Sequence, residues 1–87
     1  PNPFKDFTAI RYKLPESSNI NIKVYDLLGN EVCSLFSGIQ QAGSYNLLWN
    51  PANSAGTPLP EGIYYYRITT NSGSNLQTQT GKMVLIR

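Results

Sequence analysis

Few side chains in this chain could act as a nucleophile, a general acid or a metal ligand. The 87 residues include one cysteine, five acidic residues and no histidine. Without histidine, neither a Ser-His-Asp triad nor a Cys-His pair can form, and most zinc sites lose a ligand. A glycosidase needs two carboxylates facing each other across a cleft, which so small a domain seldom builds. We therefore expect no enzymatic activity and no cofactor or metal.

Each of these candidates has a structural explanation. Cys33 lies in the strand-like run EVCSLF, which favours a structural thiol. Most of the acids stand in or beside turns, and Asp26-Leu-Leu-Gly-Asn does not match the spacing of a calcium loop. The segment KVYDLLGNEV instead predicts a tight hairpin: Gly29 and Asn30 tolerate positive φ, and Asp26 can accept backbone N–H groups. The acids are Asp6, Glu16, Asp26, Glu31 and Glu61.

Charge and composition exclude several classes of protein. The net charge is +2, from seven basic and five acidic residues that form no run, which excludes a nucleic-acid-binding surface. No apolar stretch approaches the ~18 residues of a membrane span. With 40% hydrophobic and 14% charged residues, the chain is expected to fold as one small domain, without an internal disulfide and as a monomer.

Apolar residues alternate along the chain, as in half-buried strands, and they do not follow helical spacing. The alternation predicts strands near residues 8–14, 19–27, 31–37, 44–50, 62–70 and 75–86. Gly81 could split or bend the last strand, so the count is six or seven. Short strands separated by turn clusters indicate an antiparallel β-sandwich. The proline-rich residues 51–61 predict a crossing loop between sheets, and residues 1–7 the end of a linker.

The aromatic side chains admit two interpretations. Six tyrosines, three phenylalanines and one tryptophan are present. Alternation directs Trp49, Tyr64 and Tyr66 inward, where large rings fill a small core efficiently. Tyr65 points outward, and an exposed ring could instead stack on a sugar. The sequence favours the core and leaves the sugar platform open.

The last seven residues, GKMVLIR, read as a strand that is apolar on both faces. Because side chains alternate across a strand, Met83 and Leu85 are predicted to point into the sandwich. Val84 and Ile86 are then predicted to lie on its outer face. Such a strand is covered on both sides, or is meant to be covered by another molecule.

Several segments match one known pattern, and their order and spacing are more specific than any single segment. They are Pro1–Phe4, Thr8–Pro15, Val24–Gly29, Glu31-Val32, Gln41–Gly43, Leu48–Asn50, Gly56–Ile68 and Lys82–Arg87. The chain resembles the C-terminal sorting domain, type A, of the type IX secretion system of Bacteroidetes-like bacteria. It is also similar to the Ig-like domain of the flagellar hook-capping protein, which shares the G-x-Y-x-Y-R-[IL] strand.

The resemblance implies an Ig-like sandwich over residues 8–87, at the C-terminal end of a larger secreted protein. Such a domain is non-catalytic and directs an N-terminally fused passenger from the periplasm through the outer-membrane translocon. The implied partners are that secretion machinery and its C-terminal signal peptidase, which usually removes the domain. The implied destination is the cell surface or the medium.

The resemblance associates two segments with recognition by the translocon. One is Pro60–Tyr64, which matches P-x-G-x-Y, and the other is Gly81–Arg87. Many members carry two adjacent lysines where this chain has Gly81 followed by a single lysine. The candidate recognition residues are Gly62, Tyr64, Lys82, Val84, Ile86 and Arg87.

Each candidate also has a structural interpretation. Gly62 can serve to start a strand, and Tyr64 can fill the core. The charges of Lys82 and Arg87 can protect a sheet edge from pairing, or they can flank a strand that a receptor reads by strand addition.

Two other functions stay open on the sequence. One is a carbohydrate-binding or spacer module of an extracellular enzyme, and the other is a structural Ig-like domain of a surface or flagellar assembly. Position in the parent protein separates them, because a sorting domain must end its parent whereas a spacer can lie anywhere.

Overall fold

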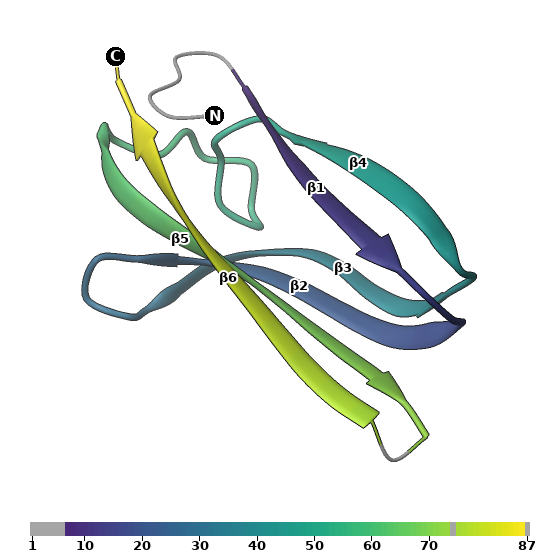
Figure 1. Ribbon diagram of the computed structural model, residues 1–87. Coiled ribbons are helices and arrows are strands. Elements are labelled where there is room, and N and C mark those ends of the chain that lie inside the picture. Colours follow the sequence, from purple (N-terminus) through teal and green to yellow (C-terminus); the bar gives the residue numbers. More distant parts are fainter. Residues whose placement is uncertain (1–6, 74, 87) are drawn as a thin grey trace.

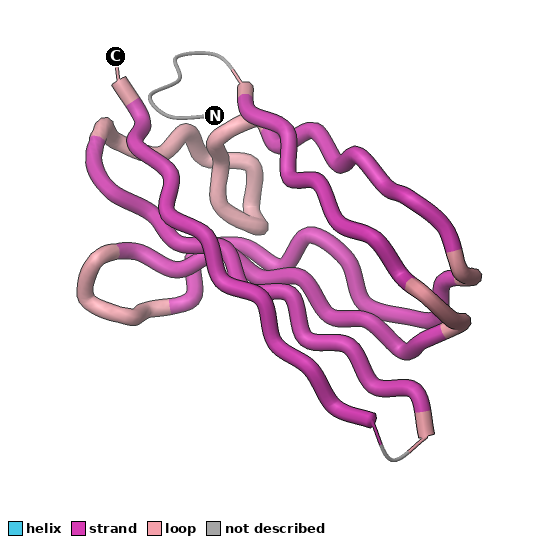
Figure 2. Tube along the Cα trace, viewed as in Figure 1, coloured by secondary structure: helices cyan, strands magenta, loops and turns pink. Residues whose placement is uncertain are grey.

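The computed structural model describes residues 7–73 and 75–86, and this part of the chain is built from strands without a helix (Figures 1 and 2). The strands are β1 (Thr8–Leu14), β2 (Ser18–Asp26), β3 (Glu31–Gln40), β4 (Gly43–Trp49), β5 (Gly62–Ser72) and β6 (Asn75–Leu85). All six predicted strands are confirmed. The largest difference is at β3, which continues to Gln40 because its last residues pair with the start of β2. Of the predicted linker end, only Phe7 lies within the described residues.

The strands form two antiparallel sheets, so the predicted all-β, Ig-like antiparallel sandwich is confirmed with six strands (Figure 1). The smaller sheet pairs β1 with β4, and the larger has the order β3-β2-β5-β6. Residues 51–61 connect β4 of the smaller sheet to β5 of the larger, as predicted for a crossing loop. Leu59 of this loop is buried, so the loop contributes to the core.

The core lies between the inward faces of the two sheets. Its buried apolar side chains are Ile10, Tyr12, Leu14, Ile20, Ile22, Val24, Cys33, Trp49, Leu59, Tyr64, Ile68, Met83 and Leu85. Burying one large apolar side chain contributes roughly 1.5–3 kcal/mol. Trp49 and Tyr64 pack edge to face across the core, with ring centroids 6.2 Å apart, which confirms their inward placement.

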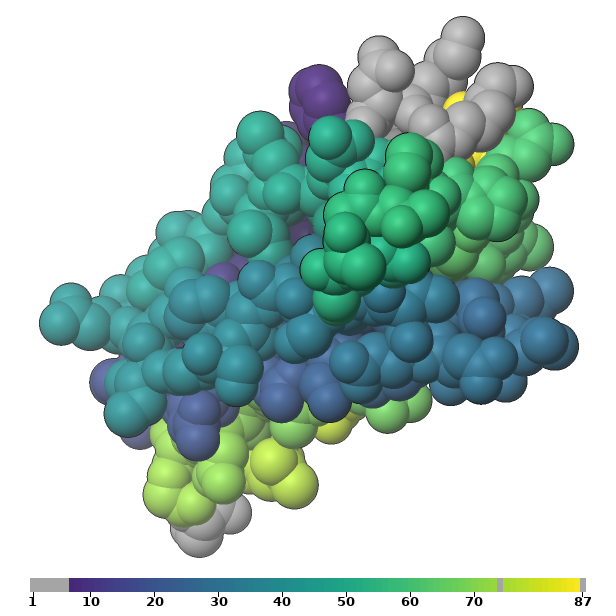
Figure 3. Space-filling view, turned by 180° about the vertical axis from the view of Figure 1, so that it is seen from behind, coloured from purple at the N-terminus to yellow at the C-terminus, as the bar shows by residue number. Residues whose placement is uncertain are grey.

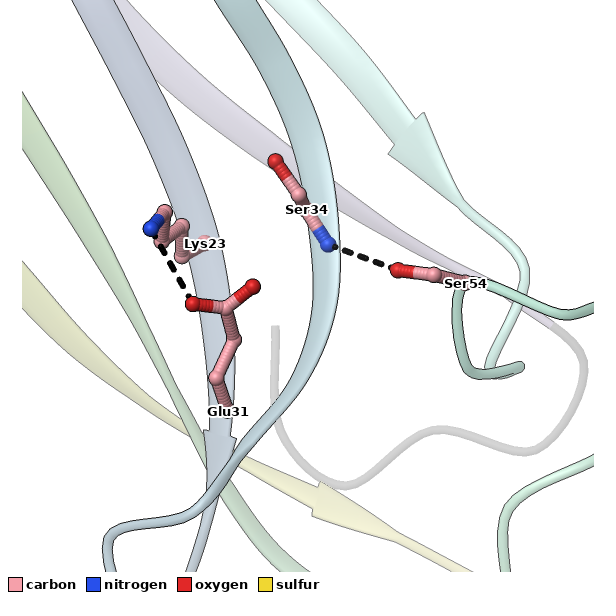
Figure 4. Close-up of polar contacts among 4 residues, drawn as sticks. All are labelled: Lys23, Glu31, Ser34 and Ser54. Carbon is pink, nitrogen blue, oxygen red and sulfur yellow. Dashed lines mark hydrogen bonds and ion pairs between the residues drawn. The ribbon is translucent and has the colours of Figure 1, made fainter.

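The free edge of β3 is protected against pairing with other chains. The pairing with β2 has two register shifts, at Ile22/Lys23 and Val24/Tyr25, and such irregularities twist an edge away from a flat template. The crossing loop lies beside the same strand (Figure 3). There the N–H of Ser34 donates to the Ser54 hydroxyl at 3.2 Å (Figure 4). Beside this contact, the N–H of Ser54 donates to the carbonyl of Val32 at 3.2 Å.

Gly81 does not split the last strand. β6 runs through it without interruption, and Gly81 lies directly opposite Tyr66 of β5. The ring of Tyr66 occupies the space where a Cβ at Gly81 would stand. Tyr66 is therefore half-buried against the core instead of deep within it, and the glycine provides a flat surface for its ring. An aromatic ring laid across a glycine on the neighbouring strand pins the register of β5 and β6.

Replacing Gly81 by alanine is expected to destabilise the domain by about 1–3 kcal/mol, because the new methyl group overlaps the Tyr66 ring. The free energy of unfolding from urea denaturation measures this. The neighbouring Thr80→Ala, at an exposed position, serves as the control and should change stability by no more than about 0.5 kcal/mol. In a Tyr66→Ala background the cost of Gly81→Ala should vanish. An unchanged cost there would contradict the ring-over-glycine contact.

Candidate functional site

The structure brings together the two segments that the resemblance associates with recognition. Gly62 pairs with Leu85, Ile63 with Val84, and Tyr64 with Met83, in antiparallel register. The segment that matches P-x-G-x-Y therefore lies directly beside the end of the last strand, although some twenty residues of chain separate them. β6 stands at the edge of the larger sheet, so this end of the strand lies at the side of the molecule (Figure 1).

Gly62 has a conformational role at the start of β5. It follows the proline-rich loop with φ of 154°, a value that side-chain-bearing residues rarely adopt. Apart from its two neighbours in the chain, no residue has a heavy atom within 4 Å of the position that a Cβ would take. Glycine is therefore required here by the backbone, and the predicted structural role of Gly62 is confirmed.

Tyr64 is buried, with 4% of its surface exposed, so its ring is not accessible to another molecule. Its hydroxyl donates a hydrogen bond of 2.7 Å to the carbonyl of Pro60. This contact ties the end of the crossing loop to β5, while the ring packs on Trp49. The predicted place of Tyr64 in the core is confirmed. From there its hydroxyl holds the end of the crossing loop beside the candidate site.

The end of β6 alternates as predicted. Met83 and Leu85 are buried, with 3% and 1% exposure, and they anchor the strand to the core. On the opposite face Lys82 is exposed and Val84 is half-buried. Ile86, just beyond the strand, is 40% exposed. Arg87 lies outside the described residues, and a recognition role for any of these side chains stays a prediction.

Sequence reasoning missed the surroundings of Tyr65. Tyr65 pairs with Lys82 of β6 on one side and with Tyr25 of β2 on the other, so the three share the outer face of the larger sheet. The guanidinium of Arg67 stands 4.8 Å from the centre of the Tyr25 ring, a cation–π contact. The alternation of apolar residues in NINIKVYD, residues 19–26, indicates that Tyr25 points outward. The alternation does not indicate which strands lie beside it, and this is known only from the strand order.

The outer face beside these residues is hollowed. A shallow hollow of about 180 Å³ is bordered by Tyr25, Leu27, Tyr65 and Arg67, among other residues. Across residues 7–73 and 75–86, no group of three His, Cys, Asp or Glu side chains could hold a metal ion. No helix in the described part of the chain is long and apolar enough to cross a membrane.

The ion pair on this face has a structural role, because it joins two strands of the larger sheet. Lys23 of β2 lies 3.0 Å from Glu31 of β3, and this hydrogen-bonded contact raises the pKa of Lys23 (Figure 4). Because both side chains are largely solvated, the pair contributes little to stability. It links the two strands on either side of the hairpin that joins them.

The two packed antiparallel sheets define an Ig-like β-sandwich module. The family model of the FlgD Ig-like domain matches residues 5–74, and the chain belongs to this family. The match ends before β6, so the last strand lies outside it. No curated protein matches the chain.

Solved structures that share this fold include FlgD and PorU. FlgD from P. aeruginosa is 32% identical over 86% of this chain, with a TM-score of 0.71, and the match spans 58% of the FlgD chain. Dimeric latent PorU from Porphyromonas gingivalis aligns over 99% of this chain and 9% of its own length, with a TM-score of 0.76. At 21% identity the PorU alignment shows the fold alone. Together these comparisons confirm the resemblance that the sequence motifs indicated.

Replacing Tyr64 by phenylalanine should destabilise the domain by about 1 kcal/mol, because the carbonyl of Pro60 loses its hydrogen bond. The adjacent Tyr65→Phe is the matched control, since this change removes a hydroxyl from the outer face, and its effect should be close to zero. Urea denaturation of the two variants measures the difference. Equal effects would show that the Tyr64 hydroxyl does not fasten the loop.

Proposed function

We propose that residues 8–87, preceded by a linker end at residues 1–7, form a non-catalytic sorting domain. The domain directs an N-terminally fused passenger through the outer-membrane type IX translocon to the cell surface. Its partners are that secretion machinery and its C-terminal signal peptidase, and the domain itself acts as a monomer. The observation that carries the proposal is the pairing of Gly62–Tyr64 with Met83–Leu85, by which the two implied recognition segments lie side by side.

The geometry supports different roles for the inward and the outward side chains at the end of the last strand. The inward residues Met83 and Leu85 fix the position and register of the last strand. The exposed side chains of Lys82 and Ile86 are then held at fixed points where a receptor can reach them. A receptor that adds a strand or offers an apolar groove reads such a pattern of alternating side chains.

The PorU alignment supports the proposal in one further respect. In PorU the same fold is a small part, 9%, of a much larger chain, as expected of a module attached to a passenger. Under this proposal Arg87 must lie at or near the C-terminus of the parent protein. A parent sequence that continues well beyond Arg87 would count against sorting.

A second candidate is a structural Ig-like module of a surface or flagellar assembly. The observation that favours it is the 32% identity to FlgD over 86% of the chain. A carbohydrate-binding module is a third alternative, on the outer-face rings Tyr25 and Tyr65. Neither alternative requires the last strand to be read by an export machinery, so a secretion assay separates both from sorting.

The test fuses residues 1–87 to a periplasmic reporter in a host that has type IX secretion, and measures the reporter on the cell surface. Deleting residues 82–87 would remove core residues, so substitutions are preferable. The variant Lys82→Ala/Ile86→Ser changes exposed side chains only, and surface delivery should fall by about tenfold or more, as for the loss of interface anchors.

The matched control is Lys13→Ala/Leu76→Ser, which changes one exposed lysine and one exposed apolar residue away from the site. Both variants should unfold at the same urea concentration as the parent. Delivery that survives Lys82→Ala/Ile86→Ser, or a parent fusion that stays in the periplasm, overturns the sorting proposal. If surface delivery falls equally in the two variants, the assay responds to the loss of any exposed lysine and apolar side chain and not to this site.

A further inference from the structure

The hairpin between β2 and β3 is held by a dense set of short hydrogen bonds. The N–H of Asp26 donates to the carbonyl of Asn30 at 2.9 Å, and the N–H of Gly29 donates to the carbonyl of Asp26 at 3.1 Å. One carboxylate oxygen of Asp26 also accepts from the N–H groups of Leu28 and Asn30, at 3.0 and 2.9 Å. Gly29 has φ of 90°, whereas no described residue other than glycine has positive φ. The predicted roles of Asp26 and Gly29 are confirmed, and the turn is rigid.

Nothing in this turn requires leucine at its tip. A turn of this kind favours an acid at its first position and glycine at its fourth, and accepts most residues between them. Leu27 is nevertheless 63% exposed and Leu28 86% exposed, and neither belongs to the core. The hairpin projects from the side of the sandwich in both opposite views of the molecule (Figures 1 and 3). A rigid, projecting turn therefore holds two large apolar side chains in water.

The tip is continuous with the outer face of the larger sheet. Leu27 borders the shallow hollow that Tyr25, Tyr65 and Arg67 also line. Tyrosine and arginine are the residue types that most often carry binding energy at protein interfaces. On its far side Tyr65 pairs with Lys82 of the candidate recognition surface. One surface thus runs from the last strand across Tyr65 to the two leucines.

We propose that Leu27 and Leu28 are anchors for an apolar pocket on a protein of the secretion machinery, with Tyr25, Tyr65 and Arg67 as the rim of the contact. The inference rests on the proposed sorting function and adds a second point of attachment on the opposite side of Tyr65 from Lys82. Because the tip is convex, the partner supplies the concave apolar surface. Its rim carries acceptor groups or acids that face the Arg67 guanidinium.

Other occupants suit this surface less well. A membrane interface is bound by a wide apolar face flanked by basic residues, whereas this turn has only two leucines flanked by Asp26 and Glu31. A second copy would have to offer a concave apolar pocket. The hollows beside Tyr12 and Tyr45, beside Asn21 and Thr69, and beside Tyr25 and Tyr65 are open and lined by mixed polar and apolar groups. A protein partner of different shape fits best.

The test uses the full 87-residue fusion in the secreting host. The variant Leu27→Ser/Leu28→Ser should keep the unfolding midpoint of the parent, because both side chains are exposed. It should lower surface delivery about tenfold, because two large apolar side chains no longer leave water on binding. The matched control, Leu48→Ser/Leu76→Ser, replaces two leucines that are 61% and 66% exposed elsewhere on the surface. Its delivery should equal that of the parent.

A photo-reactive benzoylphenylalanine at position 28 then identifies the partner in the living cell. The expected result is a cross-link to one outer-membrane secretion protein that does not form from position 48. Cross-links only between copies of the fusion, only to lipid, or to no molecule overturn the inference. A parent fusion that is not delivered overturns the sorting function and this inference together. Normal delivery of Leu27→Ser/Leu28→Ser beside a delivered parent overturns the inference alone.

Discussion

The antiparallel pairing of β5 with β6 is the constraint on which the rest of this molecule depends. The ring of Tyr66 over Gly81 sets the register, and Met83 and Leu85 then complete the inward face of the larger sheet. The same pairing brings the segment after the crossing loop beside the last strand. A shift of register by one residue would turn the buried side chains of β6 outward and expose the core.

The fold and the proposed recognition therefore depend on the same residues of β6. Residues of the inward face hold the strand, and their neighbours in sequence, Lys82, Val84 and Ile86, are displayed because the strand is held. Tyr64 and Gly62 belong to the supporting side of this arrangement, since one is buried and the other meets a backbone requirement. The residues of the two matched segments thus fall into two groups. The side chains of one group can be reached by a partner, and the residues of the other group hold those side chains in position.

Alternation alone predicted the six strands, the inward rings of Trp49 and Tyr64, and the opposite faces of Met83 and Val84, because burial on one side of a strand leaves a period of two. It could not predict which strands are neighbours. The position of Tyr65 opposite Tyr25, and the space that Gly81 leaves for Tyr66, both depend on pairings between residues distant in the chain. The exposure of Leu28 could not be predicted either, because the alternation of a strand does not extend into the turn.

The order of synthesis gives the position of Met83 and Leu85 a further consequence. They are the last core residues of this chain to leave the ribosome, so the inward face of the larger sheet stays open until they arrive. A chain broken off earlier lacks both the final strand and the packing that holds it. A sandwich whose inward face is complete therefore requires that translation has passed Leu85, whatever precedes or follows this domain in the chain.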